Sequence, residues 1–292
     1  MLFHTNIFGI VGCENNEEIS ENSLIIWDDS IGEPKNKLET GQKILNLKLK
    51  MDKIIVICFS KILIYNLKNF QYIRKIVTNE NPKGLIGINF DNEKTIIVYL
   101  TEKEDNSLTI EDLNSPNSTK TLKPHNHKIS NITLSHKGLL LATVSEEGRT
   151  IRIYDTHDGK LLQELHRGKN IADIKCISID LKTHFIAASS DRCTIHIWSL
   201  RTAIQAIKKE NKIAITEEEC KIENEGAGFF GKFLSGGGER SFIKIEIKEP
   251  YSTFHFGSEN SIIIITATGK YCKCVMDLEK KSWQITEEKQ LT

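Results

Sequence analysis

The sequence lacks an excess of charge of either sign. Its 292 residues include 39 lysines and arginines and 39 aspartates and glutamates, so the formal net charge is zero. A protein that binds nucleic acid along an extended surface usually carries a visible basic excess. We therefore expect no nucleic-acid partner, and any site for an anion must be a local cluster of basic residues.

Long apolar runs are also absent. No stretch approaches the roughly 18 apolar residues of a membrane-spanning helix. The start, MLFHTNIFGIVG, has neither the basic region nor the long apolar core of a signal peptide. We expect a cytoplasmic protein whose contact with membranes, if it makes any, is peripheral.

Paired cysteines and catalytic motifs are missing as well. The seven cysteines are scattered and odd in number, and only Cys272 and Cys274 lie close together. Without a second Cys or His pair at zinc-finger spacing, this predicts reduced thiols and no metal site. The sequence contains no G-x-S-x-G, H-E-x-x-H or Walker motif. A lone G-x-G-x-x-G match at 226–231 follows an acidic, polar stretch instead of a buried strand. We expect neither enzymatic activity nor a bound cofactor.

What the sequence does contain is a repeat of short, alternating apolar runs, which predict strands of about five residues. The segments TIRIY, ending at Tyr154, and TIHIW, ending at Trp198, resemble each other and lie 44 residues apart. Weaker copies end near three further anchors, so that the anchors in order are Trp27, Tyr65, Glu111, Tyr154 and Trp198. Their spacings of 38, 46, 43 and 44 residues match the period of a four-stranded propeller blade.

A sixth copy is centred near Met276, which lies 78 residues after Trp198. The surplus falls at about 201–240, a stretch rich in Lys, Glu and Gly, and predicts a long loop inserted within a blade. We therefore predict an all-β fold: a single β-propeller domain over residues 1–292, made of four-stranded blades, of which six are visible.

The segment LLQELHRGKN lies between the two clearest repeats and is the candidate anion-binding strand. Because side chains alternate along a strand, His166 and Arg167 point to opposite sides and serve different pockets. Gly168 would allow a sharp turn afterwards. The candidate partners of His166 are His125, Ser145, Arg149, Thr150 and Arg152, and those of Arg167 are Ser189, Ser190, Thr194 and His196. On pattern alone, these residues equally fit a WD-repeat-like protein-interaction scaffold, in which they only tie blade strands together.

The order of these residues resembles the PROPPIN (WIPI) family. The matching elements are His125, Ser145-Glu-Glu-Gly148, Arg152, Leu165-His-Arg-Gly168 and Ser189-Ser-Asp-Arg-Cys-Thr194-Ile-His196. The N-terminal segments MLFHTNIFGIVG, LIIWDD and Asn81-Pro-Lys-Gly84 are most similar to the branch that includes human WIPI four.

This resemblance implies a seven-bladed propeller that binds phosphatidylinositol 3-phosphate and 3,5-bisphosphate in two pockets flanking an Arg-Arg pair. It also implies an effector or scaffold in autophagy or endolysosomal membrane traffic, recruited peripherally to those membranes. The implied partners are membranes carrying 3-phosphorylated phosphoinositides, together with autophagy or membrane-traffic proteins at the blade rims. We expect a monomer.

The sequence departs from the family pattern at three residues and in the number of its repeats. His166 replaces the first arginine of the pair, so the first pocket loses a permanent charge and a bidentate fork. Arg149 stands where the family usually has Thr, and we expect it to replace part of that charge. Cys193 stands where Gly is usual. Finally, the repeats match the family's blades two to seven. This leaves open a six-bladed ring, a first blade missing from this chain, or another element in its place.

The inserted segment contains four apolar residues at the spacing of one face of a short helix: Phe229, Phe230, Phe233 and Leu234. The family has a membrane-inserting loop at this place, so the resemblance implies that these side chains enter the membrane. Covering the side of the propeller or binding a partner is the alternative.

Overall fold

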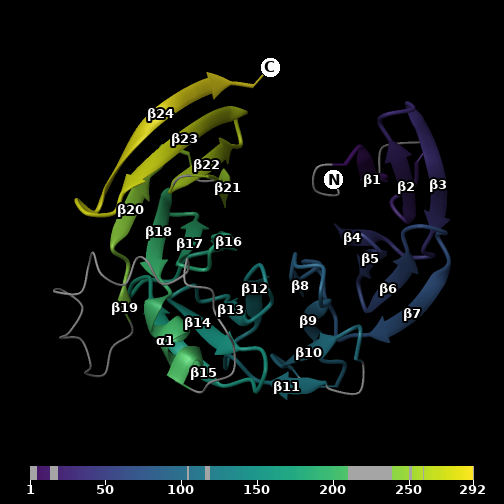
Figure 1. Ribbon diagram of the computed structural model, residues 1–292, viewed down its shortest axis with the longest axis horizontal. Coiled ribbons are helices and arrows are strands. Elements are labelled where there is room, and N and C mark those ends of the chain that lie inside the picture. Colours follow the sequence, from purple (N-terminus) through teal and green to yellow (C-terminus); the bar gives the residue numbers. More distant parts are fainter. Residues whose placement is uncertain are drawn as a thin grey trace. The chain divides into compact units, whose positions relative to one another are not determined.

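The structure is a computed structural model that describes residues 5–13, 19–103, 105–115, 119–209, 239–249, 252–258 and 260–291. In these ranges the chain forms six successive sheets and one helix, α1 (Arg201–Lys209) (Figure 1). The prediction of an all-β fold is confirmed apart from this helix. The chain divides into two units, Met1–Leu122 and Lys123–Thr292.

The first unit contains three antiparallel sheets. One sheet has three strands, β1 (Ile7–Val11), β2 (Ser23–Asp28) and β3 (Glu33–Glu39). The next has four, β4 (Ile44–Leu49), β5 (Lys53–Cys58), β6 (Lys61–Asn66) and β7 (Tyr72–Val77). The last has β8 (Gly87–Ile88), β9 (Ile96–Leu100), β10 (Leu108–Asp112) and β11 (Lys120–Leu122). In every sheet the strands pair in chain order, as in a meander.

The second unit also contains three sheets. The first consists of β12 (Ile129–Leu134), β13 (Leu140–Ser145), β14 (Thr150–Asp155), β15 (Leu161–His166) and β19 (Glu239–Arg240). The second consists of β16 (Ile174–Ile179), β17 (Phe185–Ser190), β18 (Thr194–Ser199) and β20 (Ile243–Glu246). The third consists of β21 (Ser252–Phe256), β22 (Ser261–Thr266), β23 (Lys270–Asp277) and β24 (Ser282–Gln290). All pairs are antiparallel except β15 with β19.

The six repeats seen in the sequence are the same strand of each sheet. They are β2, β6, β10, β14, β18 and β23, and each pairs with the last strand of its meander. The anchors occupy the penultimate residue of these strands: Trp27, Tyr65, Glu111, Tyr154, Trp198 and Met276. A bulge precedes the aromatic anchor in β2, β6 and β14. The predicted repeats are therefore confirmed as six equivalent structural units.

Two sheets differ from the predicted four strands. The N-terminal sheet has three strands within the described residues, because β1 pairs only with β2. The sheet that contains β15 has five, because β19 adds to its outer edge in parallel. Sequence periodicity did not reveal this fifth strand, since β19 is only two residues long and follows the inserted segment.

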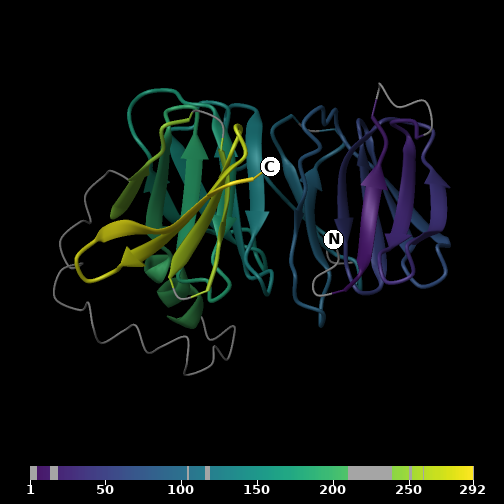
Figure 2. The same cartoon turned by 90° about the horizontal axis from the view of Figure 1, so that it is seen from above.

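The inserted segment begins as the helix α1 after β18, and the chain rejoins the same sheet at β20. The helix packs against β14 and β15, with Ala203 and Ile207 buried, and Figure 2 shows it at one end of the strands of this unit. Phe229, Phe230, Phe233 and Leu234 lie outside the described residues, so their membrane role stays a prediction. The described residues contain no helix long and apolar enough to cross a membrane.

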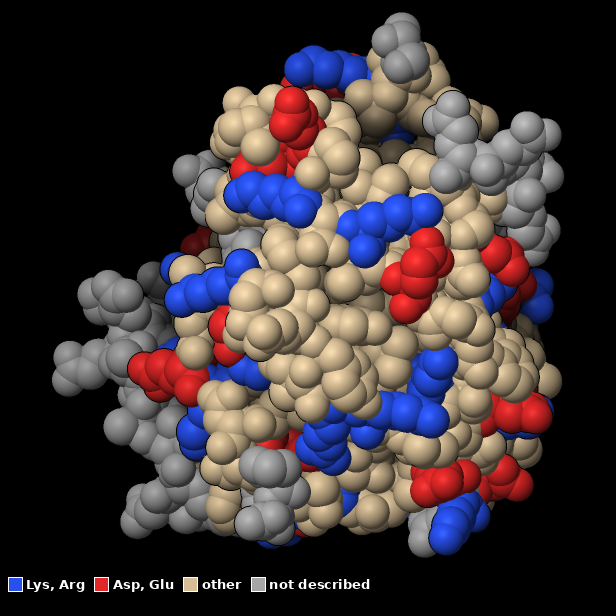
Figure 3. All heavy atoms as spheres, turned by 90° about the vertical axis from the view of Figure 1, so that its right-hand side faces the viewer, with Lys and Arg blue, Asp and Glu red and all other residues tan. Residues whose placement is uncertain are grey.

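The surface carries both signs of charge. On the face drawn in Figure 3, lysines and arginines lie in separate groups among uncharged atoms, and carboxylates lie near several of them. Ion pairs such as Lys35–Asp28 (2.6 Å) and Lys43–Glu21 (2.7 Å) are partly exposed, and such pairs add little to stability. On this face, charge alone does not mark a binding site.

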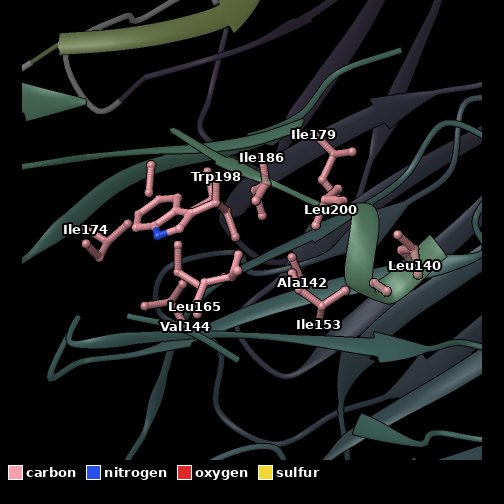
Figure 4. Close-up of a cluster of buried hydrophobic side chains, with 14 of the residues drawn as sticks. Leu140, Ala142, Val144, Ile153, Leu165, Ile174, Ile179, Ile186, Trp198 and Leu200 are labelled. Carbon is pink, nitrogen blue, oxygen red and sulfur yellow. The ribbon is translucent and has the colours of Figure 1, made fainter. Parts of the chain in front are cut away.

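One buried cluster fixes the position of the candidate strand. Leu165 is fully buried, with Val144, Ile174 and Trp198 around it (Figure 4). Burying a Leu side chain contributes roughly 1.5–3 kcal/mol. Because Leu165 is held inside this core, the two residues that follow it emerge at a defined place on the edge of the unit.

Candidate functional site

Strand register divides the polar residues around β15 into two faces. Thr150 pairs with His166, Ile151 with Leu165 and Arg152 with Glu164. Neighbours across a sheet share a face, and successive residues alternate. Ile151 and Leu165 point into the core between the β12–β15 and β16–β18 sheets. The opposite face of β15 therefore carries Glu164 and His166, whereas Arg167 continues on the core side.

We call the residues on the Glu164 face the first cluster. It consists of His125, Thr143, Ser145, Thr150, Arg152, Glu164 and His166. His125 is 5% exposed, and its Nε2 lies 3.0 Å from Thr143 Oγ1. Burial, together with the nearby charge of Arg152, lowers the pKa of His125 to about 4. At neutral pH this cluster therefore holds His125 uncharged.

The strongest cation of the first cluster is already paired. Arg152 Nε donates to Glu164 Oε2 at 2.9 Å, and its terminal nitrogen donates to the Pro124 carbonyl at 2.6 Å. Burial opposes the charge of Arg152, but the hydrogen bond and charge of Glu164 outweigh it and raise the pKa of Arg152. Because the Glu164 carboxylate cancels this charge, Arg152 and Glu164 together offer little attraction to an anion.

We call the residues on the Arg167 side the second cluster. It consists of Arg149, Arg167, Ser190, Thr194, His196 and Lys244. Ser190 pairs with Thr194 across the β17–β18 hairpin, and His196 pairs with Lys244 of β20. Burial, then Arg167, then Lys244 lower the pKa of His196 to about 4. Two cations, Arg167 and Lys244, therefore act on His196, which is uncharged at neutral pH.

Arg167 is held by main-chain carbonyls. Its Nε donates to Gly148 O at 2.5 Å, a terminal nitrogen donates to Asn170 O, and its backbone N–H donates to Arg149 O at 2.8 Å. Burial lowers the pKa of Arg167, the charge of Asp191 raises it, and Arg192 lowers it again. Since neutral carbonyls rather than carboxylates hold the guanidinium, its charge stays available.

Two buried polar atoms of the second cluster have no hydrogen-bond partner within the described residues: Arg149 Nε and Thr194 Oγ1. Thr194 is only 7% exposed. Leaving a buried polar group unsatisfied costs about 1–3 kcal/mol, so such groups usually bind water or a ligand. Unsatisfied donors beside an available arginine are what an anionic ligand would complete.

The register separates two candidate residues from the partners that we expected. Arg149 aligns with Arg167 through their backbone hydrogen bond, so it belongs to the second cluster and not beside His166. Ser189 pairs with Ile195, whose side chain faces the core shared with β21–β24, so Ser189 points away from Arg167. Ser145, Arg152 and His125 do share the face of His166. Ser190, Thr194 and His196 share that of Arg167.

The turns beside the clusters also differ in detail from expectation. Gly168 does not adopt a left-handed conformation, and a Cβ there would meet nothing within 4 Å, so no sharp turn requires glycine. Gly148 is the restricted one: its φ is +60°, and a Cβ would lie 1.9 Å from Ala172 O. Cys193 has a φ of +56°, so the chain keeps at this position a conformation that glycine favours.

Three charged residues near the clusters were missed from the sequence. Glu164 lies two residues before His166, and strand alternation alone puts it on the same face, so it was within reach. Lys244 and Arg240 belong to strands that return after the inserted segment, and pairing across such an insertion leaves no periodic signal. These two had to be found from the structure.

Comparison with known proteins places the fold and the family. Residues 34–216 match the family model described as PROPPIN. Autophagy-related protein 18e of Arabidopsis thaliana is 31% identical over 284 residues, which cover 95% of this chain and 71% of that protein. SVP1-like protein 2 of Schizosaccharomyces pombe is 24% identical, with 99% and 82% covered.

Solved structures agree on the fold. Hsv2 of Kluyvelomyces marxianus superimposes with a TM-score of 0.75 at 20% identity, covering all of this chain and 84% of that one. A complex of KlAtg21 with the coiled coil of AgAtg16 gives a TM-score of 0.79 at 18% identity, with 100% and 84% covered. The predicted β-propeller is thereby confirmed, whereas the similarity to the branch of human WIPI four stays a prediction. This chain belongs to the PROPPIN family.

Proposed function

We propose that this chain binds phosphatidylinositol 3-phosphate, phosphatidylinositol 3,5-bisphosphate or both, and acts as a peripheral membrane protein. The function is binding, without a catalytic step. In this proposal the second cluster is the principal site and the first is the weaker one. The inserted residues Phe229, Phe230, Phe233 and Leu234 would add apolar contact with the membrane.

The single observation that carries the proposal is the pair of unsatisfied buried atoms, Arg149 Nε and Thr194 Oγ1, on the face of Arg167. A phosphate monoester offers several acceptor oxygens, and charge-assisted bonds to guanidinium groups are among the strongest available to proteins. A phosphate bound here would accept from Arg149, Arg167 and Thr194 together. The cluster thus has both the charge and the unused donors that a phosphorylated inositol needs.

Relatives support a role in autophagy or endolysosomal membrane traffic. The relative from Arabidopsis thaliana is named an autophagy-related protein. The KlAtg21 structure is a complex with the coiled coil of AgAtg16, which supports autophagy proteins as partners. We propose that such partners bind at the blade rims. We propose that the chain is cytoplasmic and monomeric and is recruited to the corresponding membranes by its lipid sites. Several modest contacts on one surface then add up to stable attachment.

Liposome flotation tests the proposal. Wild type and Arg167→Ala are compared on phosphatidylcholine vesicles with and without phosphatidylinositol 3-phosphate, with a parallel series for the 3,5-bisphosphate. Lys280→Ala, which removes a charge from an exposed ion pair with Asp277, is the matched control. Losing charged hydrogen bonds of about 1.5–3 kcal/mol predicts that Arg167→Ala binds at least tenfold more weakly. Lys280→Ala should bind as wild type does.

Equal flotation of wild type and Arg167→Ala would contradict the proposal. It would favour the alternative of a WD-repeat-like scaffold that binds protein partners without lipid. Binding that requires only vesicle charge, with phosphatidylserine as effective as the phosphoinositide, would also contradict a headgroup site. Thermal melting of both variants shows whether a loss of binding reflects unfolding.

A further inference from the structure

We propose that Arg240 is a binding residue of the first cluster and supplies the guanidinium that is absent at His166. This inference rests on the proposed function, because it concerns the same phosphorylated ligand. It assigns a role to the short strand β19, which neither the repeat pattern nor the insertion itself explains.

Register places Arg240 beside His166. Strand β19 runs parallel to β15, with Glu239 opposite Leu165 and Arg240 opposite His166. Partners in adjacent strands lie on the same face of a sheet. Arg240 therefore stands on the face that carries Glu164 and His166, at the outer edge of the first cluster.

The contacts of Glu239 test this register independently. Its carboxylate accepts from Gln163 Nε2 at 2.8 Å and from Thr202 Oγ1 at 2.7 Å. Gln163 is on the face of Leu165, and Thr202 belongs to α1, which packs on that side. Because Glu239 points toward α1, the next residue, Arg240, must point the other way, toward His166.

Arg240 is an available cation, unlike Arg152. Its side chain is exposed, and no hydrogen bond or ion pair joins it to another of the described residues. The ion pair of Arg152 with Glu164 sums to no net charge, and His125 is held uncharged by burial. Without Arg240, the cluster has no surplus positive charge from arginine, whereas with it the cluster gains one guanidinium with a bidentate fork.

This arrangement explains how the family pattern can lose an arginine. An arginine in place of His166 would project from β15 itself, whereas Arg240 projects from the strand paired with it, one inter-strand spacing of about 4.8 Å away. A long arginine side chain spans that displacement, so the same phosphate can be reached from either strand. Arg149, the other candidate, lies on the opposite face.

The experiment uses the full chain with three probes: vesicles with phosphatidylinositol 3-phosphate, vesicles of equal charge made with phosphatidylserine, and soluble inositol 1,3-bisphosphate. The variants are Arg240→Ala, Arg240→Ala with His166→Arg, Arg167→Ala and the control Lys280→Ala. We expect Arg240→Ala to weaken binding to the phosphoinositide vesicles, which engage both clusters, about tenfold, and to remove the weaker of two sites in titrations with the soluble headgroup. Adding His166→Arg should restore it, and Lys280→Ala should change nothing.

Two outcomes overturn the inference and leave the proposed function standing. One is that Arg240→Ala binds as wild type does while Arg167→Ala has lost binding. The other is that Arg240→Ala weakens both vesicle types equally, leaves the soluble headgroup unaffected and is not rescued by His166→Arg, which would indicate general attraction to charged membranes. If wild type binds neither phosphoinositide vesicles nor inositol bisphosphate, the proposed function fails as well. Because Arg240 is exposed, its replacement should not change the melting temperature, and circular dichroism checks this.

Discussion

The two clusters flank one strand but hold their arginines in opposite ways. In the first cluster, Arg152 donates to the Glu164 carboxylate at 2.9 Å. In the second, Arg167 donates to the neutral carbonyls of Gly148 and Asn170. A carboxylate cancels the charge that it orients, whereas a carbonyl orients the guanidinium and leaves the charge in place. This difference is why we propose the second cluster as the principal anion site, although both lie on equivalent repeats.

The hydroxyl groups repeat this contrast. Thr143 of the first cluster is fully buried and bonded to His125. Thr194 of the second is nearly as buried but has no partner within the described residues. The first cluster is thus internally satisfied and contributes to stability, whereas the second retains unsatisfied groups that a ligand can complete. In the proposed function, the first cluster therefore contributes more to stability and the second more to binding.

Acidification should destabilise the protein through one histidine in each cluster, and this is the largest effect that we expect. His125 and His196 have pKa values of about 4 when folded, against about 6.5 when unfolded. Below pH 6.5 the unfolded chain therefore binds more protons, and stability falls as the pH drops from 6.5 to 4. The more buried His125 contributes at most about 3 kcal/mol of this loss, and the more exposed His196 contributes less. Urea unfolding at stepped pH measures it.

A bound phosphate should affect the pKa values of the two histidines differently. Its negative charge would favour protonated His196, so soluble inositol 1,3-bisphosphate, at a concentration that fills only the stronger second cluster, should reduce the acid sensitivity that His196→Gln removes. The part removed by His125→Gln should stay. An equal effect of the ligand on both variants would remove the distinction between the clusters.

Matched threonine substitutions should change stability in opposite directions. Thr194→Val removes an unsatisfied buried hydroxyl while keeping the shape, so we expect a gain of about 1 kcal/mol in the free energy of unfolding. Thr143→Val removes the partner of His125 and should lose about 1 kcal/mol. Denaturant unfolding measures both. Only Thr194→Val should weaken phosphoinositide binding, by about five- to tenfold, at the strength of one hydrogen bond.

The stability measurement and the binding measurement can each contradict the contrast between the two clusters. Destabilisation by Thr194→Val would mean that its hydroxyl has a partner in solution, and then the second cluster is as satisfied as the first. Equal loss of binding in both variants would mean that the ligand contacts both faces alike.

Much of this fold was predictable because its signals are local. The strands that end near Tyr65, Tyr154 and Trp198 are recognisable from the alternation of apolar residues within each strand. The spacing between these anchors along the sequence then predicts the blades. The separation of His166 from Arg167 follows from the same rule. The faces on which Arg149 and Ser189 lie could not be predicted from the sequence, because they depend on which residue each one pairs with across its hairpin. A shift of one residue in the strand register moves every side chain to the opposite face of the sheet.

The positions of Lys244 and Arg240 had no sequence signal. Their strands pair with β18 and β15 across the insertion, and β19 pairs in parallel, a geometry that no hairpin predicts. Glu164 was predictable in principle, since it alternates with His166. Its importance lies in its ion pair with Arg152, which only the register of β14 with β15 reveals.

Removing the charge of Glu164 should bring the first cluster closer to the second. Glu164→Gln keeps an acceptor for Arg152 Nε but no longer cancels its charge, so we expect headgroup binding to rise about threefold. The pair is partly exposed, so the loss of stability should be about 0.5 kcal/mol. Isothermal titration with inositol 1,3-bisphosphate measures the change. Glu279→Gln, in the exposed turn before β24, is the control. An equal rise in both would show only a change in net charge.

The smallest effect concerns the turn that carries the second cluster. Cys193 connects Ser190 to Thr194 with a φ of +56°, where a side chain costs about 1 kcal/mol. Cys193→Gly removes this strain but makes the unfolded chain more flexible, so the net gain in stability should be about 0.5 kcal/mol. Because the turn already has the conformation that glycine favours, Ser190 and Thr194 should keep their places and headgroup affinity should not change. A shift in affinity would show that the Cys193 side chain itself helps to shape the second cluster. The first cluster has no equivalent side chain.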